Sequence, residues 1–131
     1  MMRLLITFMV LSATFLSASS IRPGTLKAQS DGTNIAVQWG TTDESSVREF
    51  AVERRSSDGD FVTIAVIAKK GSGSFYEYVD RSAFKSSGTV YEYRIKSVML
   101  NGPAEHSDVI TITHNVSSVK RTWGSLKAMF R

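Results

Sequence analysis

The chain has 131 residues, a length that suits one domain with its own hydrophobic core. It contains no cysteine, which excludes disulfides, thiolate metal sites and cysteine nucleophiles. The formal net charge is +4, but residues 21–114 carry eleven basic and twelve acidic side chains. A nearly neutral body lacks the clustered charge that phosphate binding requires, so we expect no nucleic-acid partner.

Residues 1–20 have the order of a secretory signal peptide. Arg3 precedes an apolar run from Leu4 to Leu16, and small residues follow as far as Ser20. Such a run is too short to cross a bilayer comfortably. We therefore expect a cleaved leader and a secreted, periplasmic or cell-surface protein, with a retained N-terminal anchor as the alternative.

The first half of the body shows short alternating strands separated by turn residues. Ile35, Val37 and Trp39 recur with a period of two, which predicts a strand that faces the core. Asp58 and Gly59 supply the turn of a hairpin, and the spacing of a calcium loop is missing around them. The strands predicted here are residues 25–29, 34–39, 47–55 and 61–68.

The second half is organised around residues 88–98. Tyr91, Tyr93 and Ile95 alternate there with charged residues, which is typical of a half-buried central strand. Thr89 and Tyr91 lie where a β-sandwich carries a tyrosine corner, a buried ring whose hydroxyl bonds to nearby backbone. The other strands predicted here are residues 75–79 and 109–113, giving seven in all. The side chains predicted to be buried are Trp39, Phe50, Val52, Tyr91, Tyr93 and Ile95.

Several of these segments resemble fibronectin type III modules, most closely those of secreted and cell-surface proteins of Bacteroidetes-like bacteria. The segments that carry the resemblance are residues 35–39, 49–59, 78–80, 88–98 and 101–102. The resemblance covers residues 23–113 and implies an all-β, seven-stranded, immunoglobulin-like sandwich without catalytic residues. Two features depart from the family: Gly40 replaces the proline that often follows the tryptophan, and no Arg-Gly-Asp sequence is present.

The residue types of catalytic and metal sites form no convergent pattern. The only histidines, His106 and His114, lie near the last predicted strand, where exposed polar residues are expected. The carboxylates that alternate with apolar residues should lie on outward, solvated faces, and they are Glu49, Glu53, Glu77 and Glu92. We therefore expect no catalytic residue, no metal and no cofactor.

The C-terminal tail, residues 115–131, combines aromatic and basic residues. Its apolar residues fall at helical spacing with basic residues mostly off that stripe, which predicts an amphipathic basic helix, although Gly124 weakens it. The candidate interaction residues are Trp123, Leu126, Lys127, Phe130 and Arg131. Three alternatives remain open for the tail: docking on its own sandwich, binding a partner or an anionic membrane surface, and disorder.

These features favour a secreted, non-catalytic interaction module, an adhesion or assembly component that binds a protein partner. The alternative is a structural subunit that self-associates through its sheet edges or its tail. A carbohydrate-binding module ranks lower, because Trp39, Tyr91 and Tyr93 are all predicted to be in the core. Exposed, coplanar aromatic side chains would favour it.

Overall fold

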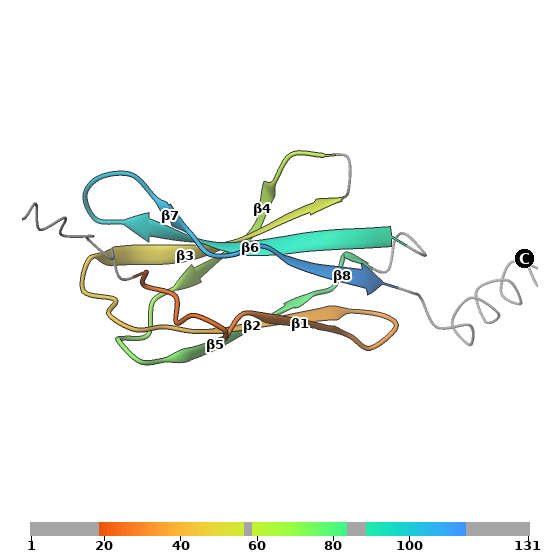
Figure 1. The fold of residues 1–131 in the computed structure, drawn as a ribbon, viewed down its shortest axis with the longest axis horizontal. Coiled ribbons are helices and arrows are strands. Elements are labelled where there is room, and N and C mark those ends of the chain that lie inside the picture. Colours follow the sequence, from red (N-terminus) through yellow and green to blue (C-terminus); the bar gives the residue numbers. More distant parts are fainter. Residues whose placement is uncertain (1–18, 57–58, 84–88, 115–131) are drawn as a thin grey trace, which may run out of the picture.

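The computed structural model describes residues 19–56, 59–83 and 89–114, and these segments form an all-β fold (Figure 1). They contain eight strands: β1 (Lys27–Ser30), β2 (Ile35–Gly40), β3 (Val47–Ser56), β4 (Val62–Ala68), β5 (Phe75–Asp80), β6 (Thr89–Met99), β7 (Glu105–His106) and β8 (Ile110–His114). In the parts of the chain described, no helix is long and apolar enough to cross a membrane. The expectations for residues 1–18 of the leader and for the tail fall outside the described residues. Tyr91, at the predicted tyrosine corner, is described and is buried.

The strands form two antiparallel sheets that lie face to face (Figure 1). The three-stranded sheet has the order β1-β2-β5. In the five-stranded sheet β4 pairs with β3, β3 pairs with β6, and β6 pairs with both β7 and β8. The prediction of seven strands missed β7, which pairs only with Lys96 and Ser97 of β6. A two-residue strand is too short to produce a visible alternation in sequence.

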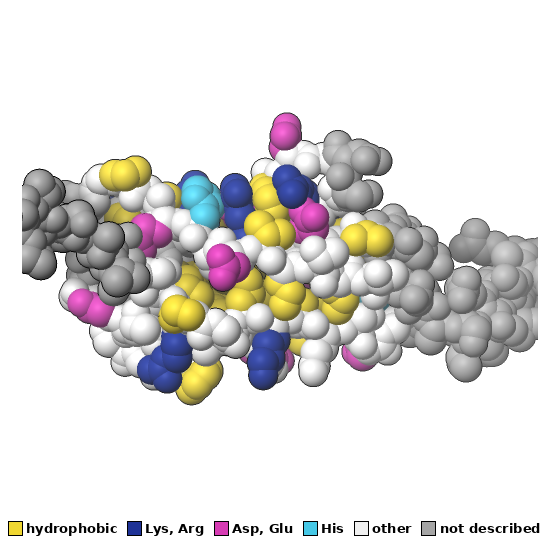
Figure 2. Space-filling view, viewed as in Figure 1, with side chains coloured by type: hydrophobic (Ala, Val, Ile, Leu, Met, Phe, Trp, Pro, Cys, Tyr) yellow, Lys and Arg dark blue, Asp and Glu magenta, His cyan; other side chains and the backbone are white. Residues whose placement is uncertain are grey.

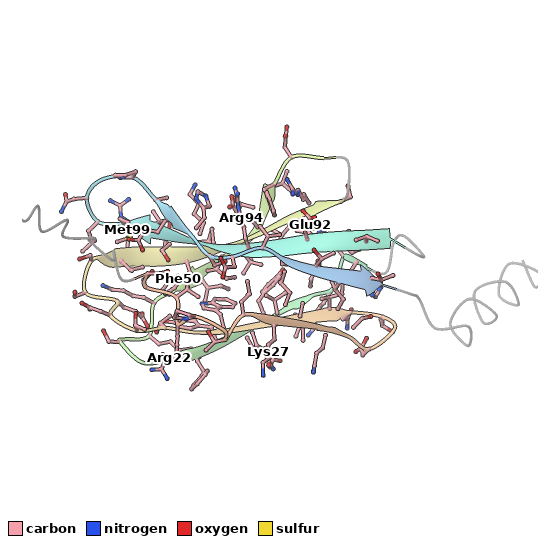
Figure 3. The ribbon with its side chains drawn as sticks, viewed as in Figure 1. Arg22, Lys27, Phe50, Glu92, Arg94 and Met99 are labelled. Atoms are coloured by element: carbon pink, nitrogen blue, oxygen red, sulfur yellow. The ribbon has the colours of Figure 1, made fainter. Side chains whose placement is uncertain are left out.

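An aromatic cluster joins the two sheets at the centre of the core. The rings of Trp39 on β2 and Tyr76 on β5 stack with centroids 5.2 Å apart and planes 4° apart. Phe50 on β3 meets both rings edge-on, and Figure 3 shows it between the two layers. All six side chains predicted to be in the core are buried. The alternation in the sequence therefore identified the inward faces of β2, β3 and β6 correctly.

A buried carboxylate makes a second connection between the sheets. Asp80, at the end of β5, is 1% exposed and accepts hydrogen bonds from the Tyr93 hydroxyl at 2.6 Å and from Nη1 of Arg54 at 2.5 Å. The Ser82 hydroxyl donates to its other oxygen at 2.7 Å. Burial would raise the pKa of Asp80, but the hydrogen bonds from Tyr93, Ser82 and Arg54 outweigh it and hold the pKa below its usual value of 3.8.

Ser20, the last residue of the predicted leader, packs against the sandwich. The hydroxyl oxygens of Ser20 and Ser97 lie 2.6 Å apart, and both residues are buried. Ile21 is also buried and forms an isolated bridge with Thr41. Ser20 is thus part of the packed structure, in contact with β6.

We expect Trp39→Ala to lower the free energy of unfolding by about 3–5 kcal/mol, because it removes the ring that stacks on Tyr76 and leaves a cavity between the sheets. Urea unfolding followed by far-UV circular dichroism measures this loss. Trp39→Phe keeps an aromatic ring and should lose less. A loss for Trp39→Ala below about 1 kcal/mol would contradict the central position of this ring.

Asp80 should contribute to the pH dependence of stability. Because its pKa is lower in the folded state, its contribution is present above the unfolded value of 3.8 and is lost as the pH falls through the folded pKa. We expect Asp80→Asn to be less stable than the wild type at pH 7, with the difference shrinking below about pH 4. Urea unfolding between pH 3 and pH 7 tests this, with the exposed Asp60→Asn as the control. A difference that stays constant with pH would contradict the assignment.

Candidate functional site

An exposed aromatic side chain lies on the outer face of the three-stranded sheet. Phe75, the first residue of β5, is 68% exposed and pairs in register with Gly40 of β2. A Cβ atom built on Gly40 would come within 3.1 Å of Cε1 of the Phe75 ring. The ring therefore lies across the glycine, and any other residue at position 40 would have to displace it. This close approach explains glycine at the end of a buried strand.

Polar side chains surround this ring. Gln38 and Glu77 face each other across β2 and β5, and Nε2 of Gln38 donates to Oε2 of Glu77 at 2.7 Å. Lys27 of β1 pairs in register with Gln38 on its other side. Nζ of Lys70 donates to the main-chain oxygen of Phe75 at 2.9 Å. We call these five residues, Lys27, Gln38, Lys70, Phe75 and Glu77, the Phe75 face.

The Phe75 face includes a shallow depression that continues along the sheet. Gln38, Lys70, Phe75, Tyr76 and Glu77 line the first part. A neighbouring depression shares Glu77 and extends to the β1–β2 turn; its other lining residues are Gln29, Ser30, Asp31, Asn34, Ala36 and Val79. The surface that results is long and open, with amide and carboxylate groups along it, and it suits an extended ligand better than a small enclosed one.

A buried carboxylate holds the segment that leads into this site. Glu44 is 2% exposed and accepts hydrogen bonds from the Tyr76 hydroxyl at 2.8 and 2.9 Å and from Thr41 Oγ1 at 2.6 Å. The Tyr76 hydroxyl in turn accepts from the main-chain N–H of Lys70 at 2.6 Å. Burial raises the pKa of Tyr76 to about 12, and the Glu44 carboxylate acts in the same direction. The hydroxyl therefore stays protonated at neutral pH and fixes the backbone of Lys70.

The outer face of the five-stranded sheet is different, because its charges pair with one another. Arg55 forms an ion pair with Glu92, and Nε of Arg94 lies 2.8 Å from Oε1 of Glu53. Both guanidinium groups lie over the ring of Phe61, at 4.5 and 4.0 Å from its centroid. Figure 3 shows Glu92 and Arg94 on this outer side. The cations and the aromatic ring here already have partners within the fold.

Two expectations about polar residues were wrong. Glu53 faces outward as predicted but is only 7% exposed, because Arg94 bonds to it and Nε2 of His106 lies 3.5 Å from its carboxylate. His114 is fully buried, since β8 extends to it and its Nδ1 lies 2.7 Å from the hydroxyl of Ser30 on β1. Within residues 19–56, 59–83 and 89–114, no group of three or more His, Asp or Glu is placed to hold a metal ion.

β4 is one edge of the five-stranded sheet, opposite β7 and β8, and it bears on the expectation of self-association through sheet edges. β4 carries no charged residue, and Val62 and Val66 on it are exposed. Its pairing with β3 shifts register between Val52 and Glu53. Such an irregularity bends an edge strand and interrupts the regular pattern that another strand would need for pairing.

The residues that the sequence proposed for interaction lie outside the described part of the chain: Trp123, Leu126, Lys127, Phe130 and Arg131. Trp39, Tyr91 and Tyr93 are buried, as predicted, and are not available to a ligand. Sequence reasoning missed Phe75, because aromatic residues occupy both alternating positions of β5. The signal that could have found it is Glu77, which shares its side of the strand.

No protein-family model matches the chain, and no curated protein matches it either. Its fold is similar to part of pectate lyase PelI from Erwinia chrysanthemi in complex with tetragalacturonic acid, with a TM-score of 0.53 and 25% identity over 66% of this chain and 27% of the enzyme chain. A second structure of that enzyme matches with a TM-score of 0.53 and 24% identity, over 66% and 26%. The Br derivative of BhCBM56 matches with a TM-score of 0.43 and 22% identity, over 71% and 86%. The chain thus spans about a quarter of the pectate lyase chains that it matches.

We expect Tyr76→Phe to lower the free energy of unfolding by about 1–3 kcal/mol, because the buried Glu44 carboxylate loses a donor and the Lys70 N–H loses its acceptor. Thermal and urea unfolding measure this loss. Tyr78→Phe, on the same strand, is the matched control and should cost less. Equal stability of Tyr76→Phe and the wild type would show that the hydroxyl network does not hold this segment.

Proposed function

We propose that the chain is a non-catalytic, carbohydrate-binding module of fibronectin type III-like architecture, and that it binds its ligand on the Phe75 face. The observation that carries the proposal is the exposed Phe75 ring, laid across Gly40 beside the Gln38–Glu77 pair. A sugar ring has one face of C–H groups, which packs on an aromatic ring, and hydroxyls at its rim, which bond to amides and carboxylates. The Phe75 face offers both kinds of group.

The shape of the site supports a chain-like ligand. The two depressions share Glu77 and together follow the sheet from Phe75 to the β1–β2 turn. The ring is supported from below by the backbone of β2, so little conformational entropy is lost when a ligand covers it. A polysaccharide, which repeats one unit, would place one sugar on the ring and others along the polar part of the surface.

The likeness to part of a pectate lyase supports the same proposal. The matched region is about a quarter of an enzyme whose structure holds an oligosaccharide, tetragalacturonic acid. A fold of this kind within a polysaccharide enzyme is consistent with an accessory role beside such a substrate. The signal-like order of residues 1–20 favours a position outside the cytoplasm, where polysaccharides of cell surfaces are found.

The two-sheet arrangement supports the fibronectin type III-like part of the proposal. The first, second and fifth strands form one sheet, the remaining strands form the other, and the predicted aromatic residues fill the space between them. In immunoglobulin-like folds, function depends on surfaces grafted onto this scaffold and differs from one member to another. The Phe75 face is such a surface here.

We expect Phe75→Ala to weaken binding roughly 10- to 100-fold, since covering a phenylalanine side chain contributes about 1.5–3 kcal/mol. Affinity electrophoresis in gels that contain polygalacturonate, galactan or β-glucan measures the binding. Phe61→Ala, which removes an aromatic ring from the opposite sheet, is the matched control and should retain it. Gly40→Val, which keeps Phe75 but displaces its ring, should behave as Phe75→Ala does.

Thermal unfolding of each variant separates lost binding from lost folding. The proposal fails if the wild type is not retarded by any of the three polysaccharides. It also fails if folded Phe75→Ala binds as the wild type does while Phe61→Ala does not.

A further inference from the structure

We infer that the Phe75 face selects anionic polysaccharides, chains whose sugars carry carboxylate groups; this inference rests on the proposed function. Two basic side chains, Lys27 and Lys70, belong to the Phe75 face. The main chain of Arg22 is nearby, because its N–H donates to the oxygen of Gly40 at 2.8 Å, but Arg22 lines a separate depression together with Asp108. Figure 3 shows Arg22 and Lys27 pointing away from the core on the outer side of the three-stranded sheet.

The Phe75 face has two cations, Lys27 and Lys70, and one carboxylate, Glu77, whose oxygen already accepts a hydrogen bond from Gln38. Among the described residues, neither lysine forms an ion pair with a carboxylate, although Nζ of Lys70 lies over the Tyr76 ring, 5.0 Å from its centroid. Asp31 lies at the far end of the neighbouring depression. Figure 2 shows dark blue Lys and Arg side chains along the lower edge of the molecule and also on its upper side.

Two of the cations on the opposite sheet are paired with carboxylates, and Lys96 on β6 is a further cation there. There the guanidinium groups of Arg55 and Arg94 each have a carboxylate partner, Glu92 and Glu53. Forming such pairs within the fold leaves little charge to attract a ligand. On the Phe75 face, two lysines without a carboxylate partner lie on the same side as an exposed aromatic ring, and this combination points to a ligand with both an apolar ring face and a negative charge.

One ligand could stack a sugar on Phe75 and bring a carboxylate to a lysine at the same time. Nζ of Lys70 donates to the oxygen of Phe75 and lies over the Tyr76 ring, and its remaining ammonium hydrogens can meet a ligand. Lys27 on β1 is in register with Gln38 and, two strands or about 10 Å away at the usual strand spacing, with Glu77 on β5. A carboxylate-bearing chain that crosses the strands would stack one sugar on Phe75 and place carboxylates near cations at both ends of the crossing.

The test compares an anionic polysaccharide with a neutral one, and adds single-stranded DNA as an anionic polymer that is not a polysaccharide. Binding of the full chain to polygalacturonate, neutral galactan and single-stranded DNA is measured by isothermal titration calorimetry at 50 and 500 mM NaCl. We expect polygalacturonate to bind at least tenfold more tightly than galactan at low salt and to lose most of that advantage at high salt. In Lys27→Gln/Lys70→Gln the advantage should fall at least fivefold, while binding that depends on Phe75 remains. Lys96→Gln, on β6 of the other sheet, is the charge-matched control.

The outcomes separate the two proposals. Equal, salt-independent binding of polygalacturonate and galactan, both abolished by Phe75→Ala, overturns the preference for anionic chains and leaves the carbohydrate-binding function standing. DNA that binds as tightly as polygalacturonate overturns the inference, since any polyanion would then suffice. The absence of binding to every polysaccharide overturns both. A selective, salt-sensitive interaction with polygalacturonate that the double lysine variant loses supports both.

Discussion

The inward position of Tyr76 determines most of what this fold can present on its surface. Its ring stacks on Trp39, and its hydroxyl links Glu44 to the backbone of Lys70. Because side chains alternate along a strand, burying Tyr76 forces Phe75 and Glu77 onto the outer face. A slip of one residue in β5 would instead bury Phe75 and expose the tyrosine hydroxyl to water, and Glu44 would lose its donor. The core contact and the exposed ring are thus two sides of one register.

Two buried carboxylates reinforce this register at opposite ends of β5. Glu44 is bonded to Tyr76 near the start of the strand, and Asp80 at its end is bonded to Tyr93 and Arg54 of the other sheet. A buried charge is costly unless hydrogen bonds satisfy it, so each carboxylate restricts its neighbours to the one arrangement that supplies donors. In a chain without cysteine, these networks supply specific links between the sheets that apolar packing alone does not provide.

Alternation in the sequence was sufficient to predict most strands and all six core side chains, because a half-buried strand repeats with a period of two. It could not identify polar residues that are buried through contacts from distant segments. His114 is buried because β8 lies against β1, and Glu53 is covered by Arg94 from β6. Phe75 was missed for the opposite reason. An aromatic residue in a strand suggests the core, and only the pairing with Gly40 shows where its ring lies.

Net charge was also a poor guide to the surface, because it averages two faces of different character. The body is nearly neutral in total, and on that basis we expect no nucleic-acid partner. On the five-stranded sheet, ion pairs between β3 and β6 join cations with carboxylates. On the described outer face of the three-stranded sheet, neither Lys27 nor Lys70 has a carboxylate partner, and both belong to the Phe75 face. The distribution of pairing partners, rather than the number of charges, decides which face of the sandwich can attract an anionic ligand.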